Sequence, residues 1–124
     1  MAIDIDTIFD MLSWNSNETT QIKGIKEAKK IKHLSVLIMP IESKSVWENC
    51  AKVLISKSDK ELIPYLYELF RWLQDMNWPG AYLIYDRLKL IPRQILENVF
   101  QFCLEIAQKT NDIPWIESLN DFKK

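Results

Sequence analysis

The residues that could bind metal or act as thiol nucleophiles are few and widely spaced in this chain. Cys50, Cys103 and His33 are its only two cysteines and its only histidine. A structural zinc site needs four ligands of these types, which three residues do not supply. Each cysteine lies within an apolar stripe of helical spacing, so we expect two buried free thiols rather than a disulfide. No metal and no other cofactor is predicted.

One short segment has the letters of a nuclease motif. Glu27-Ala28-Lys29 follows Asp10, and a Glu-x-Lys pair acts when both side chains leave one face of a strand beside a shared metal. On a helix, positions two apart diverge by about 200°, and the surrounding pattern is helical. A Ser-His-Asp or Cys-His arrangement has no elbow glycine or oxyanion loop beside it. We therefore assign no catalytic residue, and the sequence favours a protein that is not an enzyme.

Basic residues gather in one stretch, and phosphate binding is the function they suggest. The stretch holds only one acid, Glu27, and five lysines: Lys23, Lys26, Lys29, Lys30 and Lys32. Lysines at a helix surface are more simply explained by solvation and by the helix dipole. The whole chain has 16 basic and 17 acidic residues, a net charge of −1, which argues against a general nucleic-acid binder. Nucleic-acid binding through residues 23–32 is therefore the weakest of three hypotheses.

Helices must position all of these side chains. Apolar residues recur at spacings of three and four, and neither Asn-Gly turns nor period-two alternation occurs. The chain has 124 residues, 48% of them hydrophobic, which is enough for one core. Links of two to five residues place neighbouring helices antiparallel. We predict a single all-α domain over residues 1–124, with about three helix pairs and a short N-terminal capping helix over residues 5–12.

The segment from about Asp59 to Gln74 is predicted to be the central helix, because it is apolar over most of its circumference. Pro64 near its start predicts a late beginning or a kink. The leucines that form its main stripe are Leu62, Leu66, Leu69 and Leu73.

Helix starts are marked by capping residues. Ser45 with Glu48, and Ser58 with Glu61, match the reciprocal capping box. Asp112 is expected to cap the last helix. Asn77 is expected to cap the helix that has Pro79 in its first turn, and its side chain should accept the N–H of Gly80.

Two resemblances bear on the architecture. Pro79 and Pro114 stand 35 residues apart in expected helix openings, a period typical of helical-hairpin repeats. The second hairpin resembles a HEAT-type repeat in the order of its apolar and acidic positions, namely Pro64, Leu66, Leu69, Asp75, Ala81 and Leu88.

A more specific resemblance lies in the turn of that hairpin. Its sequence is Trp72-Leu73-Gln74-Asp75-Met76-Asn77-Trp78-Pro79. This segment resembles the signature of a bacterial family of domains of unknown function, number 5071. The members of that family are small helical proteins. The resemblance implies a right-handed stack of antiparallel hairpins, a HEAT-like α-α superhelix, and it implies no activity.

The first residues of the chain help to predict the cellular compartment of the protein. Residues 1–6 carry two carboxylates where a signal peptide needs positive charge. No segment approaches the roughly 20 apolar residues of a membrane span. We expect a cytoplasmic protein without a membrane partner.

The predicted interaction surface follows the second hairpin and consists of Asp75, Trp78, Tyr82 and Asp86. Five tryptophans are many for a core of this size. Trp47 and Trp72 fit the apolar stripes, whereas Trp14, Trp78 and Trp115 lie at helix ends, where an indole is often half buried and tryptophan is common in interfaces.

These observations favour a non-enzymatic interaction module that binds another protein, such as a bacterial immunity or adaptor protein, and they leave a homo-oligomer open. The main alternative is a small-ligand-binding protein or an acid/base enzyme. It would use carboxylates around Asp75 and Asp86 with Arg71 or Arg87, and it requires a pocket that encloses at least two of these groups.

Overall fold

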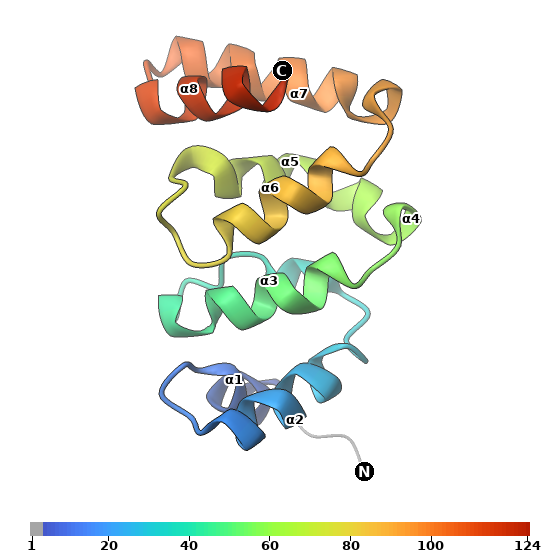
Figure 1. Ribbon diagram of the computed structural model, residues 1–124, viewed down its shortest axis with the longest axis vertical. Coiled ribbons are helices and arrows are strands. Elements are labelled where there is room, and N and C mark those ends of the chain that lie inside the picture. Colours follow the sequence, from blue (N-terminus) through green and yellow to red (C-terminus); the bar gives the residue numbers. More distant parts are fainter. Residues whose placement is uncertain (1–3) are drawn as a thin grey trace.

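The computed structural model describes residues 4–124, and within that range the chain forms helices and no strand. Figure 1 shows the helices stacked along the long axis of the molecule, with two side by side at most levels. The all-α prediction is therefore confirmed. The first three residues of the acidic start, on which the argument about a signal peptide partly rests, lie outside the described range.

Most of the helices are short, and the longest, α7, has 17 residues. In chain order they are α1 (Ile5–Leu12), α2 (Glu18–Ala28), η1 (Leu34–Leu37), η2 (Lys44–Val46), α3 (Trp47–Ile55), α4 (Asp59–Leu62), η3 (Ile63–Tyr65), α5 (Leu66–Arg71), η4 (Trp72–Gln74), α6 (Ala81–Lys89), α7 (Arg93–Lys109) and α8 (Ile113–Phe122), where η denotes a 3-10 helix. Of the helices within residues 4–124, none combines the length and hydrophobicity that crossing a bilayer would demand.

Packing joins the helices both in pairs and along the stack. Within pairs, α1 contacts α2, η1 contacts α3, and α7 contacts α8. Along the stack, α2 contacts α3, α3 contacts α6, and α5 contacts α7. The helix at the N-terminus, α1, thus packs as a pair with α2.

The segment predicted as the central helix consists of α4, η3, α5 and η4. Pro64 lies in η3, where the missing proline N–H interrupts the α-helical hydrogen bonding. The helix therefore kinks where expected. The leucines of the predicted stripe are all buried, with 2% or less of each exposed: Leu62, Leu66, Leu69 and Leu73.

Aromatic rings fill the core of the last two layers. The Phe70 ring lies 5.9 Å from that of Phe100 and 5.3 Å from that of Phe122, both edge to face. The Phe70 carbonyl accepts the indole N–H of Trp115 at 3.0 Å. Although Trp115 lies at a helix end, where an indole can be half buried, only 1% of it is exposed. Its polar atom has a partner in the core, so the whole indole can be buried.

Both cysteines are buried and free, as predicted. Removal from water disfavours the thiolate and raises the pKa of Cys50 to about 12. Burial likewise raises the pKa of Cys103 to about 12, although the charge of Arg71 acts in the opposite direction. The two thiols are therefore protonated at neutral pH and have the character of apolar core side chains.

Two of the four predicted caps are confirmed and two are wrong, one of them Ser45. Ser58 and Glu61 form the reciprocal capping box of α4, and Asp112 Oδ1 accepts the Trp115 N–H at the start of α8. Ser45 caps no helix. It lies inside η2, which delays the start of α3 to Trp47, and its hydroxyl hydrogen-bonds the hydroxyls of Ser13 and Ser43 instead.

Candidate functional site

The turn between η4 and α6 holds the residues of the predicted signature and is closed by its own polar groups. The Trp72 indole N–H donates to the Pro79 carbonyl at 3.0 Å. Asp75 Oδ1 accepts the backbone N–H of Asn77 at 2.8 Å, and the Asp75 carbonyl accepts the N–H of Trp78 at 3.0 Å. Asp75 is therefore held in the turn by a local bond that favours this backbone shape.

The first turn of α6 is fixed by contacts with α3. Gly80 precedes the helix with a φ of +83°, a left-handed conformation that glycine adopts without strain. Its N–H donates to Glu48 Oε1 at 2.9 Å. A Cβ at Gly80 would lie 2.7 Å from the Ala51 Cβ, so the turn and α3 are in direct contact.

The prediction that Asn77 caps α6 is wrong. The helix begins at Ala81, with Gly80 in the N-cap position. Asn77 is three residues too early, its side chain is exposed, and that side chain makes no hydrogen bond within residues 4–124. Pro79 also lies before the helix rather than in its first turn. The bond expected from the Gly80 N–H exists, but a carboxylate from another helix accepts it.

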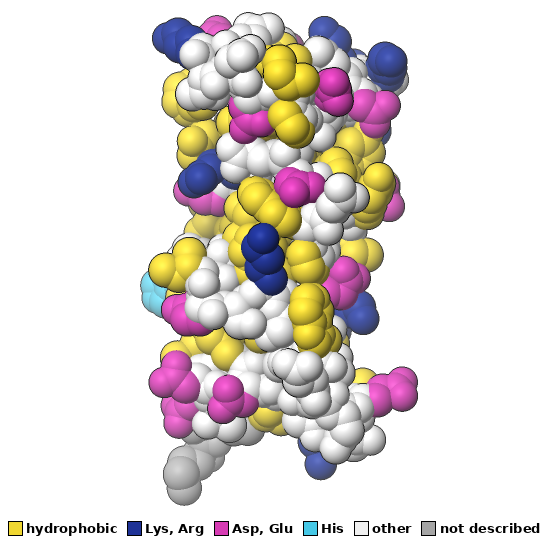
Figure 2. All heavy atoms as spheres, turned by 90° about the vertical axis from the view of Figure 1, so that its left-hand side faces the viewer, with side chains coloured by type: hydrophobic (Ala, Val, Ile, Leu, Met, Phe, Trp, Pro, Cys, Tyr) yellow, Lys and Arg dark blue, Asp and Glu magenta, His cyan; other side chains and the backbone are white. Residues whose placement is uncertain are grey.

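Trp78 belongs to a cluster of three indoles. Its ring lies 5.5 Å from that of Trp47, which lies 6.0 Å from that of Trp72, and both pairs are edge to face. The Lys44 ammonium lies 5.6 Å from the Trp78 ring centroid and 5.7 Å from that of Trp47, within cation–π range. Figure 2 shows the side of the molecule on which this turn lies, where hydrophobic side chains form patches between charged ones. Trp47 and Trp72 are core residues, as predicted, and Trp78 is half buried against them.

A groove runs between α6 and α8 and has a volume of about 340 Å³. We call it the α6/α8 groove. Its lining residues are Met76, Tyr82, Tyr85, Asp86, Glu117, Ser118 and Asp121. Of these, Asp86 is exposed, and Tyr82 is 66% exposed, which is high for a tyrosine. The structure thus divides the predicted surface: Tyr82 and Asp86 share the groove, whereas Asp75 and Trp78 lie in the turn.

The α6/α8 groove is acidic. Its three carboxylates belong to Asp86, Glu117 and Asp121, and no lysine or arginine lines it. None of the three forms an ion pair with a side chain in residues 4–124. The Tyr85 hydroxyl donates to Asp121 Oδ2 at 2.6 Å. Burial, followed by this bond and by the charges of Asp121 and Asp86, raises the pKa of Tyr85 to about 12, so the groove keeps a neutral phenol among its acids.

The two arginines of the acid/base hypothesis have other contacts. The Arg87 guanidinium donates to Asp59 Oδ1 at 2.7 Å and to the Lys57 carbonyl at 2.8 Å, which ties α6 to the start of α4. The Arg71 guanidinium lies 6.0 Å from the ring centroid of Tyr67. Neither arginine lines the α6/α8 groove. The structure therefore does not bring Asp75, Asp86 and an arginine into one pocket.

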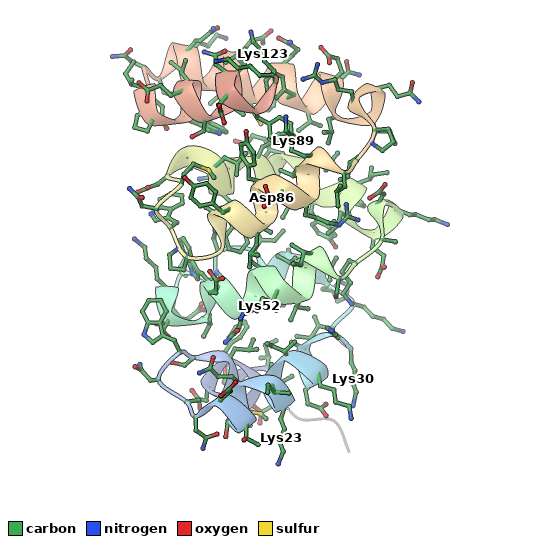
Figure 3. The ribbon with its side chains drawn as sticks, viewed as in Figure 1. Lys23, Lys30, Lys52, Asp86, Lys89 and Lys123 are labelled. Carbon is green, nitrogen blue, oxygen red and sulfur yellow. The ribbon has the colours of Figure 1, made fainter. Side chains whose placement is uncertain are left out.

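The lysine-rich stretch lies on and just after α2. Glu27 lies on α2, not on the strand that a nuclease motif needs, and it forms an ion pair with Lys30 at 3.1 Å. Lys23 points away from the end of the stack in Figure 3. Across residues 4–124, no group of three or more His, Cys, Asp or Glu side chains is arranged to hold a metal ion.

Glu117 and Asp121 are groove residues that the sequence analysis missed. They come from α8, which pairs with α7, and so lie outside the hairpin that carries Tyr82 and Asp86. The signal was nevertheless present, because Glu117 is 35 residues after Tyr82 and Asp121 is 35 residues after Asp86. The same spacing of 35 residues separates Pro79 from Pro114.

Comparison with known proteins gives one match. A family model described as a domain of unknown function (DUF5071) matches residues 43–123, which is more than half of the chain and includes the turn and the α6/α8 groove. No curated protein and no solved structure matches the chain.

Proposed function

The chain belongs to the DUF5071 family, whose description assigns no activity, and we propose from the geometry that it is a non-enzymatic module that binds another protein. As the sequence analysis anticipated, a bacterial immunity or adaptor protein in the cytoplasm fits this proposal. The module would be the single domain of residues 1–124.

A HEAT-like, right-handed α-α superhelix is the architecture that we propose for the stack. Each helix pair contacts the next layer, as in repeats that bury a continuous core by stacking. Stacks of this kind expose helix faces in register along one side, and such faces suit an extended partner.

The observation that carries the proposed function is the α6/α8 groove. It combines a largely exposed tyrosine, Tyr82, with three carboxylates that have no ion-pair partner within residues 4–124. Tyrosine is enriched at the residues that dominate binding energy. Unpaired charges at a rim steer association with a partner of opposite charge. A basic segment of a protein is therefore the occupant that fits best.

The alternative of a small-ligand site or an acid/base enzyme has less support. Asp86 lies in a groove of about 340 Å³, which is large enough for a small ligand. However, Asp75 is held in the turn, and Arg87 is bonded to Asp59 and Lys57. Nucleic-acid binding through residues 23–32 remains the weakest proposal.

Affinity capture from the native host tests the proposal. The tagged protein would be compared with a variant that carries Tyr82→Ala and Asp86→Lys, because both side chains are exposed and their replacement should leave the fold intact. We expect specific protein partners with the unchanged chain and a loss of at least tenfold in their recovery with the variant. A control, Lys60→Glu, changes the charge by two units in the opposite direction at an exposed position of α4 and should retain every partner.

A second double variant, Asp75→Ala with Trp78→Ala, separates the two parts of the predicted surface. If the groove binds the partner, this variant loses less than the groove variant. Full recovery of every partner by the Tyr82→Ala and Asp86→Lys variant would contradict the proposal.

A further inference from the structure

A second cavity lies at the far end of the stack, between the start of α7 and the end of α8. Its volume is about 360 Å³, which is within the range of small-molecule sites. Leu96, Phe100 and Phe122 form the apolar floor of the cavity, where at most 6% of each side chain is exposed. The Phe100 and Phe122 rings stack with their centroids 6.1 Å apart. We call this cavity the α7/α8 pocket.

The polar lining of the α7/α8 pocket is mainly basic. Arg93, Lys123 and Lys124 contribute three positive charges, and Glu97 is the one acid. An adjoining hollow of about 430 Å³ shares Arg93 and Lys124 and adds Lys89. Together the two hollows are lined by four basic side chains and one acidic side chain, the reverse of the α6/α8 groove.

Two of these cations are fixed by the backbone of α8. The Lys89 ammonium donates to the Phe122 carbonyl at 2.5 Å and lies 4.9 Å from the Phe122 ring centroid. The Arg93 guanidinium donates to the Lys123 carbonyl. Because the last carbonyls of a helix lack intrahelical partners, these bonds hold both cations beside the pocket.

Lys123 and Lys124 differ in this respect. Their ammonium groups form no hydrogen bond and no ion pair with any residue in 4–124. Figure 3 shows Lys123 at the end of the stack and Lys89 on α6 at the level of the gap to α8, with Asp86 about one turn earlier on the same helix. Two exposed cations without a partner in the described part of the chain, with two further cations fixed nearby, give this end of the stack a positive charge that attracts an anionic group.

We propose that the α7/α8 pocket binds a small anion with an apolar body, such as a medium-chain or aromatic carboxylate. The apolar body would lie against Leu96, Phe100 and Phe122, and the carboxylate would face Lys123 and Lys124. This inference concerns a different surface from the α6/α8 groove and does not depend on the proposed protein-binding function.

Fluorescence titration tests it. The probe is 1-anilinonaphthalene-8-sulfonate, which has a sulfonate on an apolar body. We expect saturable binding of one molecule per chain, weakened by added salt. Decanoate should displace the probe, whereas decanol, which has the same chain without the charge, and acetate, which has the charge without the chain, should not at the same concentration.

Charge variants locate the site. Lys123→Gln with Lys124→Gln should weaken probe and decanoate binding by about fivefold, the effect of two partly exposed charges, without loss of the helical circular dichroism. The control pair Lys52→Gln with Lys60→Gln removes two exposed lysines elsewhere and should leave both affinities unchanged. Absence of probe binding, equal displacement by decanol, or equal affinities for the two double variants would each overturn the proposal.

Discussion

The backbone N–H of Gly80 donates to Glu48 Oε1 at 2.9 Å, although 32 residues separate them in the sequence. This bond satisfies the first turn of α6 with a carboxylate from α3. It also joins the turn of one helix pair to the helix of the preceding layer. The position of Tyr82 and Asp86, the second and sixth residues of α6, therefore depends on a contact between layers.

Replacement of Gly80 tests how much the contact between this turn and α3 contributes to stability. In Gly80→Ala, a non-glycine residue would have to adopt a φ of +83°, and its Cβ would lie 2.7 Å from the Ala51 Cβ. Together, the left-handed conformation and the overpacking should lower the free energy of unfolding by about 3 kcal/mol. Urea denaturation measures this difference, and a loss below about 1 kcal/mol would contradict the geometry.

Glu48 and Asn77 can be compared directly as capping residues. Glu48→Ala removes the acceptor of the Gly80 N–H and should cost about 1 kcal/mol, the usual value of a lost helix cap. Asn77→Ala should change stability by less than about 0.5 kcal/mol, since its exposed side chain caps nothing in the structure. If the two costs were reversed in urea unfolding, Asn77 would be the cap after all.

We expect Arg87 to stabilise the fold rather than to take part in acid/base catalysis. Its side chain is 13% exposed and donates to Asp59 and to the Lys57 carbonyl. Asp59 is 40% exposed, so solvent weakens the pair. Arg87→Leu should therefore cost about 1–2 kcal/mol in thermal or urea unfolding. Arg71→Leu, at an exposed position on α5, should cost clearly less, and equal costs would argue against this role of Arg87.

The buried thiols predict a loss of stability at alkaline pH. The pKa of each is about 12 in the folded protein, against an ordinary value of 9.0. Below pH 9 both states keep the thiols protonated, and their contribution to stability is complete. Between pH 9 and 12 only the unfolded chain ionises, which favours unfolding by up to about 1.4 kcal/mol per pH unit for each thiol.

Urea unfolding at pH 7.5, 9 and 10.5 measures that loss. Tyr85, whose pKa is raised from 10.0 to about 12, adds to it above pH 10. A variant with Cys50→Ala and Cys103→Ala should be less stable at pH 7.5, because it leaves cavities, but its stability should fall less steeply with pH. An unchanged slope would mean that the thiols titrate alike in both states.

Local features of the structure could be predicted from the sequence. The kink at Pro64, the Ser58 box and the Asp112 cap each depend on residues within one or two helical turns. Ser45 does not cap α3 because it lies inside a 3-10 helix that Ser43 caps, and its hydroxyl bonds that of Ser13, 32 residues earlier. The prediction that Asn77 caps α6 is wrong for a similar reason, because the group that accepts the Gly80 N–H is Glu48 on α3.

The α6/α8 groove could be predicted only in part. Tyr82 and Asp86 share a face of one helix, and their spacing of four shows this. Asp75 and Trp78 are near in sequence, but the left-handed Gly80 turns the chain between them and α6. Glu117 and Asp121 could be assigned to the groove only if α6 and α8 were known to lie side by side. The one sequence feature that could have indicated this is the spacing of 35 residues that separates them from Tyr82 and Asp86.

The central claim is that the α6/α8 groove binds a partner protein, and site-specific photo-crosslinking in host cells tests it most directly. The photoreactive residue benzoylphenylalanine would replace Tyr82, with Lys60 as the matched exposed control position. We predict a discrete crosslinked protein from position 82 that is absent from position 60 and that disappears when Asp86→Lys is added. The same products from both positions, or a product at 82 that Asp86→Lys leaves unchanged, would contradict the claim.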